Sequence, residues 1–190
     1  MAGSSKLVPR LREAQYDAEG DIWRIVESGN IAALRHYIEH GGPVDIVDED
    51  GDPLLVCAIW DNRLDVVTAL LDAGAPVELA NGDYTVMLAA CEAETASAPL
   101  VRLLLDRAAL VNAANQEGTT PLLAALRGRC CSVDVFRVLI DAGASVQDEP
   151  GARCESPLQA ACDNGELDHV KSLLRSNSDV NYRSENSETW

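Results

Sequence analysis

The stretch Thr68–Gly82, TALLDAGAPVELANG, joins a run of leucines to a glycine, an extended Pro-Val-Glu segment and a second glycine turn. Related phrases occur four more times, and a valine follows the break in each of them. A fixed period of this size indicates stacked supersecondary units, each too small to bury its own apolar face. The valines are Val44, Val77, Val111, Val146 and Val180, at intervals of 33, 34, 35 and 34 residues.

Each unit opens with a glycine turn and a short alanine-rich segment, as in GTTPLLAAL from Gly118. Thr120, like Ser156 in the last unit, is suited to accept hydrogen bonds from the unpaired N–H groups of a first helical turn. The prolines that follow, Pro121 and Pro157, stand where a missing N–H costs nothing. The pattern therefore predicts that a short helix begins at these positions.

A second helix is predicted in each unit, because apolar residues recur at the spacing that makes one broad buried face. It ends at Gly74 in one unit and at Gly143 in another, where glycine can adopt the left-handed conformation that closes a helix. Ala108 stands at the same place in the third unit, so we expect a strained and slightly frayed helix end there. The apolar positions in the second unit are Val66, Val67, Leu70 and Leu71.

These units resemble the ankyrin-repeat family, whose repeat of about 33 residues carries the motif T-P-L-H-x-A. The resemblance spans Glu19 to Tyr182 and implies an all-α fold, a solenoid of stacked helix-turn-helix units with β-hairpin-like turns. We expect an N-terminal arm at 1–16, repeats at 17–47, 48–80, 81–114, 115–148 and 149–182, and a C-terminal tail at 183–190. The histidine of the family motif is absent, and the residues in its place are Trp23, Val56, Met87, Leu123 and Gln159.

The first and last units differ from the middle ones. Arg35 and His36 on the second helix of the first unit indicate an N-terminal cap, and residues before Asp17 either add a helical turn or stay disordered. In the fifth unit His169 and Ser172 replace apolar residues, which predicts a polar outer face and an array that is complete at five. Units three and four carry extra residues between their helices, within CEAETASAPLV and LRGRCCSVDVF.

Charge and composition exclude several classes of function. The 190 residues carry 15 Lys and Arg against 31 Asp and Glu, a net charge of -16, which repels nucleic acid and anionic membranes. Nothing approaches 18 consecutive apolar residues, so no membrane span is expected. The six cysteines form no CxxC pair, which favours reduced thiols in the cytoplasm or nucleus. Cys130 and Cys131 lie beside Arg129, so they are either reactive thiols or an ordinary half-buried pair.

Catalytic and cofactor motifs are not recognisable in the sequence. It contains no Gly-rich phosphate loop, nucleophile elbow or zinc-protease motif, and no cofactor is expected. His36 and His40 lie four residues apart, a spacing that suits a metal, but no third ligand is recognisable and ordinary helix-end histidines are favoured. We therefore expect a chain that is not an enzyme.

The resemblance implies binding of a partner protein through the turn tips and the concave groove formed by the first helices. Acidic residues dominate these positions in the first three units, which favours a basic segment of the partner. Trp60 is singled out as an anchor, because exposed tryptophan is rich in binding hot spots, although its ring can equally fold over Ile59 as packing. The predicted partner-binding residues are Glu49, Asp50, Asp52, Trp60, Asp61, Asp83, Tyr84, Glu92, Glu117, Arg127 and Asp163.

Two other functions fit the same sequence. The chain is of a size that resembles ankyrin-type inhibitors of cyclin-dependent kinases, so a regulatory inhibitor of a kinase or phosphatase is one alternative. A scaffold or targeting subunit that works through its tail and inserted loops is the other. A monomer or a subunit of a hetero-complex is expected in each case.

Overall fold

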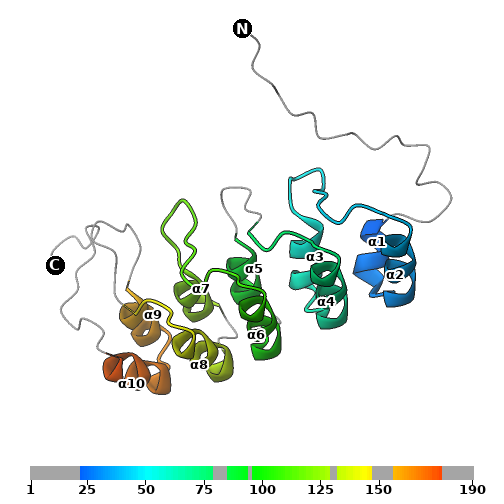
Figure 1. Ribbon diagram of the computed structural model, residues 1–190. Coiled ribbons are helices and arrows are strands. Elements are labelled where there is room, and N and C mark those ends of the chain that lie inside the picture. The colour runs from blue at the N-terminus through cyan, green and yellow to red at the C-terminus, as the bar shows by residue number, and fades with distance from the viewer. Residues whose placement is uncertain (1–21, 79–84, 94–95, 129–131, 147–155, 177–190) are drawn as a thin grey trace, which may run out of the picture.

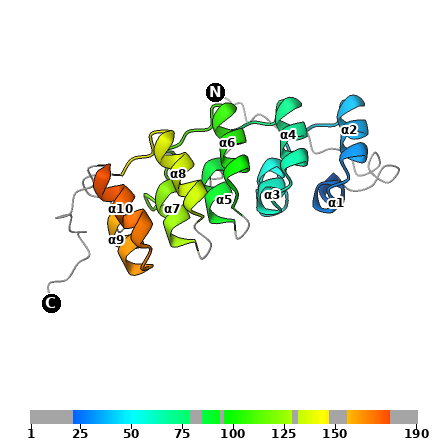
Figure 2. The same cartoon turned by 90° about the horizontal axis from the view of Figure 1, so that it is seen from below.

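A computed structural model describes residues 22–78, 85–93, 96–128, 132–146 and 156–176, and this part of the chain folds into ten helices. The helices form five antiparallel pairs that stand side by side in chain order (Figure 1). Seen from below, the odd-numbered helices make one layer and the even-numbered helices a second (Figure 2). The helices are α1 (Ile22–Ser28), α2 (Ile31–Glu39), α3 (Leu54–Trp60), α4 (Leu64–Asp72), α5 (Val86–Glu92), α6 (Ala98–Asp106), α7 (Pro121–Arg127), α8 (Val133–Asp141), α9 (Pro157–Asp163) and α10 (Leu167–Arg175).

The core runs between the two layers along the whole stack. Each odd helix packs against the next odd helix and against the even helix of its own pair, and the even helices pack in the same order. The interior consists mainly of Leu, Val and Ala, whose small and branched side chains allow close helix spacing. Val44, Val77, Val111 and Val146 pack against this core from the segments that follow the even helices. The fold is therefore the expected helical solenoid.

Three of the odd helices begin with a side-chain cap, as their sequences predict. The hydroxyls of Thr85, Thr120 and Ser156 accept hydrogen bonds from the backbone N–H three residues on, at 3.1, 3.3 and 3.0 Å. A cap of this kind stabilises a helix by about 1 kcal/mol. In α3 the position is held by Pro53, which makes no side-chain cap.

The helix end at Ala108 is strained but intact. Ala108 adopts a left-handed φ of 66°, as Gly74 (φ 91°) and Gly143 (φ 87°) do at the equivalent ends. The N–H of Ala109 donates to the carbonyl of Leu104 at 3.0 Å, matching the bond that closes α4. The expected fraying of the third unit is therefore wrong, because these closing bonds and the buried leucines of α6 offset a conformational cost of about 1–2 kcal/mol.

The last unit does not turn His169 outward. His169 is buried, and its ring packs against Phe136 of α8 with 4.6 Å between the ring centroids. The predicted polar outer face at this position is wrong, because the residue faces the preceding unit and not the end of the stack. In the first unit Arg35 and His36 are exposed, as expected. Ser172 is half-buried.

Polar bonds tie consecutive units together at the edges of the layers. Arg63 donates from Nη2 to the carbonyl of Glu27 at 3.1 Å, and Ser97 donates from Oγ to Asn62 Oδ1 at 2.8 Å. Asn164 donates to the carbonyl of Leu126 in the same way. These bonds connect residues about one repeat apart in sequence, so they fix how far each unit is displaced from the last.

Candidate binding site on the face of the turns

Two turns project beyond the odd-numbered layer and are built by the same hydrogen bonds. Asp48 Oδ1 accepts from the backbone N–H of Asp50 at 3.0 Å and of Asp52 at 2.8 Å. In the fourth unit Asn115 Oδ1 accepts from Glu117 at 3.1 Å and from Thr119 at 2.9 Å. Because the side chain of the first residue occupies the backbone donors, the residues between them point their own side chains outward.

The odd helices end in a row of exposed side chains beneath these turns. Each last helical residue occupies the same place in its unit, and neighbouring odd helices pack side by side. Helices that pack this way lie about 8–10 Å apart, so the row has one side chain per unit at that spacing. The row consists of Ser28, Trp60, Glu92, Arg127 and Asp163. We call the turns and this row the binding face.

Carboxylates gather at the second unit of the binding face. Burial, followed by the charges of Asp48, Asp52 and Asp61, raises the pKa of the Cys57 thiol on α3 from 9.0 to about 11. The three acids therefore act on one point from the turn and from the end of the helix. Trp60 is 38% exposed and ends the same helix, between Cys57 and Asp61 in sequence.

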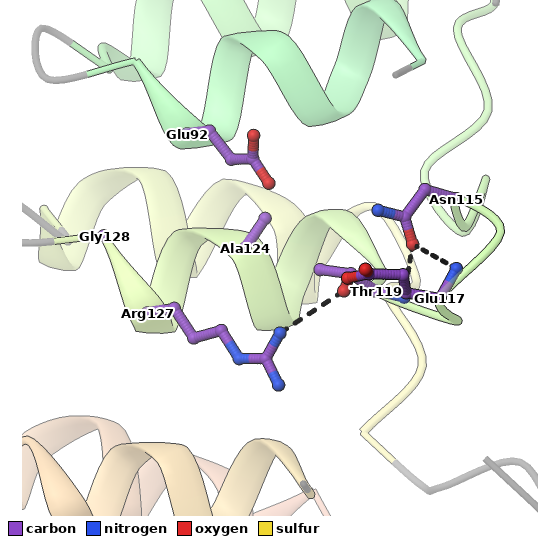
Figure 3. A pocket seen from close by; sticks show the side chains of 7 residues that line it. All are labelled: Glu92, Asn115, Glu117, Thr119, Ala124, Arg127 and Gly128. Carbon is purple, nitrogen blue, oxygen red and sulfur yellow. Dashed lines mark hydrogen bonds between the residues drawn. The ribbon is translucent and has the colours of Figure 1, made fainter. Parts of the chain in front are cut away.

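A depression of about 530 Å³ lies between the third and fourth units. Glu92 and Arg127 extend into it from the ends of α5 and α7, and the small side chain of Ala124 lies between them (Figure 3). Arg127 Nη1 donates to Thr119 Oγ1 at 3.3 Å, which holds its guanidinium against the turn. We call this depression the repeat-four pocket; its lining residues are Glu92, Asn115, Glu117, Thr119, Ala124, Arg127 and Gly128.

The pocket changes the electrostatics of Glu92. Desolvation raises the pKa of the Glu92 carboxyl above its ordinary 4.5. Arg127 opposes this effect and Glu117 adds to it, but burial dominates. Glu92 as a whole is exposed, so the pocket removes only part of the water around its carboxylate.

Most of the predicted binding residues lie on the binding face. Glu49 and Asp50 are exposed on the first turn, Asp52 is half-buried beside them, and Glu117 is exposed on the second turn. Asp61 and the helix-end row are also exposed. Asp83 and Tyr84 lie outside the described residues. The structure adds Asn115, Ala124 and Gly128 as pocket-lining residues that the sequence did not single out, because their place follows from packing between units.

Two residues next to the binding face are covered. Thr119, in the turn before α7, is 4% exposed, and Cys91, near the end of α5, is 2% exposed. Both side chains face inward, so neither presents its surface to a partner directly.

The histidine pair of α2 has a local structural explanation. His40 Nδ1 and the carbonyl of His36 form a hydrogen bond of 2.7 Å, and the two rings lie 4.1 Å apart. No group of three or more metal-binding side chains occurs among the residues that the structure describes. Cys130 and Cys131 lie outside them. Within the described ranges no helix has the length and apolar character needed to cross a membrane.

The fold and its binding face define a helical solenoid that presents turns and helix ends to a partner. Residues 86–184 match the family profile for ankyrin repeats in three copies. The chain belongs to the ankyrin-repeat family, whose repeats generally mediate protein–protein interactions.

Relatives with named domains show the same repeats in longer chains. The ankyrin repeat and KH domain-containing protein mask-1 of Caenorhabditis elegans is 31% identical over 152 residues, 77% of this chain and 6% of that protein. The ankyrin repeat, SAM and basic leucine zipper domain-containing protein 1 of Notamacropus eugenii is 30% identical over 107 residues, 55% of this chain and 22% of that protein. Human ankyrin repeat and SOCS box protein 16 is 33% identical over 129 residues, 66% of this chain and 27% of that protein. The chain thus spans less than a third of each of these relatives.

Proposed function

We propose that this chain is a non-enzymatic interaction module whose binding face takes a Lys- or Arg-bearing segment of a partner protein. The observation that carries the proposal is that Trp60 is exposed at the end of α3, the helix on which three carboxylates act on Cys57. Aromatic rings at the centre of an interface supply much of the binding energy, and complementary charge speeds the encounter and sets the preference for a partner. An indole ring also attracts a cation placed over its face.

The proposal is tested by affinity capture with the purified chain, followed by binding measurements on the captured protein. Trp60→Ala should weaken binding by about 2 kcal/mol or more, and affinity should fall as salt concentration rises. Leu64→Ala is the matched control, because Leu64 has the same exposed fraction of 38% but begins α4. Binding that ignores both salt and the Trp60 substitution would contradict the proposal.

The same experiment separates the other functions that fit the sequence. A captured kinase or phosphatase whose activity falls on addition of the chain would make it a regulatory inhibitor. Binding that survives Trp60→Ala but is lost when Ser184 to Trp190 are removed would make the tail the docking element, as in a scaffold or targeting subunit.

A further inference from the structure

We propose that the repeat-four pocket receives one Arg or Lys side chain of the partner segment and that Glu92 is its ion-pair partner. This inference rests on the proposed function and adds to it a particular place and a particular kind of side chain. Trp60 does not line the pocket, so the two ideas can fail separately.

The first step is the state of the Glu92 carboxylate. Within the described part of the chain it takes part in no hydrogen bond or ion pair, although its side chain extends over the pocket (Figure 3). Desolvation without a direct partner is unfavourable for a charged group. A cation that enters the pocket supplies a direct partner, so its binding offsets the desolvation that raises the pKa of the Glu92 carboxyl.

The second step is the balance of charge in the pocket. Among the lining residues that the structure describes, Glu92 and Glu117 contribute two negative charges and Arg127 one positive charge, so one positive side chain balances the charge of these residues. Arg127 is directed toward the turn by its bond to Thr119 Oγ1. The side of the pocket next to Glu92 is therefore the side that attracts a cation.

The third step is shape. The pocket has a volume of about 530 Å³, and the small residues Ala124 and Gly128 lie among its lining. Long basic side chains place their aliphatic stem against apolar surface while the charged head reaches polar groups. Here the head would meet Glu92 and the stem would lie between the ends of α5 and α7, where Figure 3 shows Glu92 and Arg127 extending.

The test uses the whole chain and small probes that isolate the side chain. The probes are Nα-acetyl-arginine amide, its neutral counterpart Nα-acetyl-citrulline amide, and Nα-acetyl-glutamate amide, each titrated into the ¹⁵N-labelled chain and followed by NMR. The arginine probe should shift the amide signals of Glu92, Ala124 and Gly128 in a saturable way. The citrulline probe should bind roughly five- to tenfold more weakly, because a charged hydrogen bond becomes a neutral one.

Two matched variants sharpen the result. Glu92→Gln keeps the shape of the side chain and should reduce the affinity for the arginine probe to that of citrulline. Glu39→Gln removes the same charge from the exposed end of α2 and should leave binding at the pocket unchanged. Lower pH should weaken the arginine probe as Glu92 becomes protonated, and Glu92→Gln should abolish this dependence.

Three outcomes would overturn the inference. They are arginine-induced shifts spread over acidic residues across the surface, equal binding of arginine and citrulline, and preferential binding of the glutamate probe beside Arg127. If one of them occurs while a captured partner still depends on Trp60 and on salt, the proposed function stands and only the pocket assignment fails. If the arginine probe binds as expected but no partner depends on Trp60, the pocket assignment stands and the wider proposal fails.

Discussion

Units two and four share one backbone design but differ in the chemistry that they expose. Asp48 and Asn115 each accept two backbone N–H groups within their turns, and Gly51 and Gly118 each take a left-handed conformation near φ 88° and 83°. Asp48 also donates its own N–H to the carbonyl of Asp52, as Asn115 does to that of Thr119. The turn is thus set by one acceptor side chain and one glycine.

The helices that follow the two turns differ at several equivalent positions. Unit two has Pro53, Cys57 and Trp60 where unit four has Thr120, Ala124 and Arg127. The thiol of Cys57 lies in an acidic surrounding, whereas the smaller, buried Ala124 lines the pocket into which Glu92 and Arg127 extend. In both units, the side chain that accepts backbone hydrogen bonds and the glycine of the turn determine the backbone. Different residues on the helix that follows give unit two an aromatic residue near acidic groups and give unit four a pocket of mixed charge.

The largest expected effect tests the shared part of the design. Asn115→Ala removes the acceptor of two backbone hydrogen bonds and should lower the free energy of unfolding by about 2 kcal/mol. Asp48→Ala should cost a similar amount for the same reason. Urea denaturation followed by circular dichroism measures both. If either variant unfolds like the wild type, the turns are not built on these side chains.

Exchanging the two acceptors sharpens the same test. Asp48→Asn keeps the acceptor oxygen and removes a charge next to Asp50 and Asp52, so stability should be unchanged or slightly higher. Asn115→Asp keeps the geometry and adds a charge beside Glu117, so stability should fall slightly. A large loss in both exchanges would show that charge, and not the shared acceptor, determines the turn.

The next effect concerns a feature that the two units do not share. Thr120 caps α7 with a hydrogen bond of 3.3 Å to the N–H of Leu123, whereas Pro53 gives α3 no side-chain cap. Thr120→Ala should therefore lower the free energy of unfolding by about 1 kcal/mol, and Thr120→Ser should restore most of it. Thermal denaturation of the three proteins measures the difference. An alanine variant as stable as the wild type would mean that packing alone holds the start of α7.

Much of the scaffold could be predicted from the sequence because it depends on local rules. The period of the valines, the caps at Thr120 and Ser156, and the glycine at helix ends all act within a few residues. These features sufficed to place the helix pairs, and the partial exposure of Trp60 followed from its position at a helix end.

The features that could not be predicted depend on neighbouring units. His169 is buried by Phe136, which lies 33 residues earlier in the chain. The backbone hydrogen bonds that close α6 at Ala108 are kept because the buried leucines hold this helix in place. The conformational propensity of alanine gives no information about such packing. Thr119 is covered, and the repeat-four pocket joins residues from two units. Contacts between units follow the offset of the stack, which no single repeat encodes by itself.

The smallest effect concerns Cys57, which occupies in unit two the position that Ala124 occupies in unit four. Burial and the three nearby acids raise the pKa of the Cys57 thiol to about 11, so at mildly alkaline pH it should react with iodoacetamide far more slowly than a thiol in the unfolded chain. Asp61→Asn should speed the reaction by removing one of the repelling charges, whereas Asp72→Asn, an equal loss of charge at the end of α4, should not. Mass spectrometry of the alkylated peptide gives the rates.

The same thiol should make stability depend on alkaline pH. Because the folded pKa lies above the ordinary 9.0, the folded chain holds the proton more tightly than the unfolded chain between 9.0 and about 11. Stability from this group is therefore fully present below 9.0 and is lost as the pH rises through about 11. Cys57→Ala, which gives unit two the residue of unit four, should flatten this part of the pH profile. An unchanged slope would mean that neither burial nor the acids of unit two raise the pKa of this thiol.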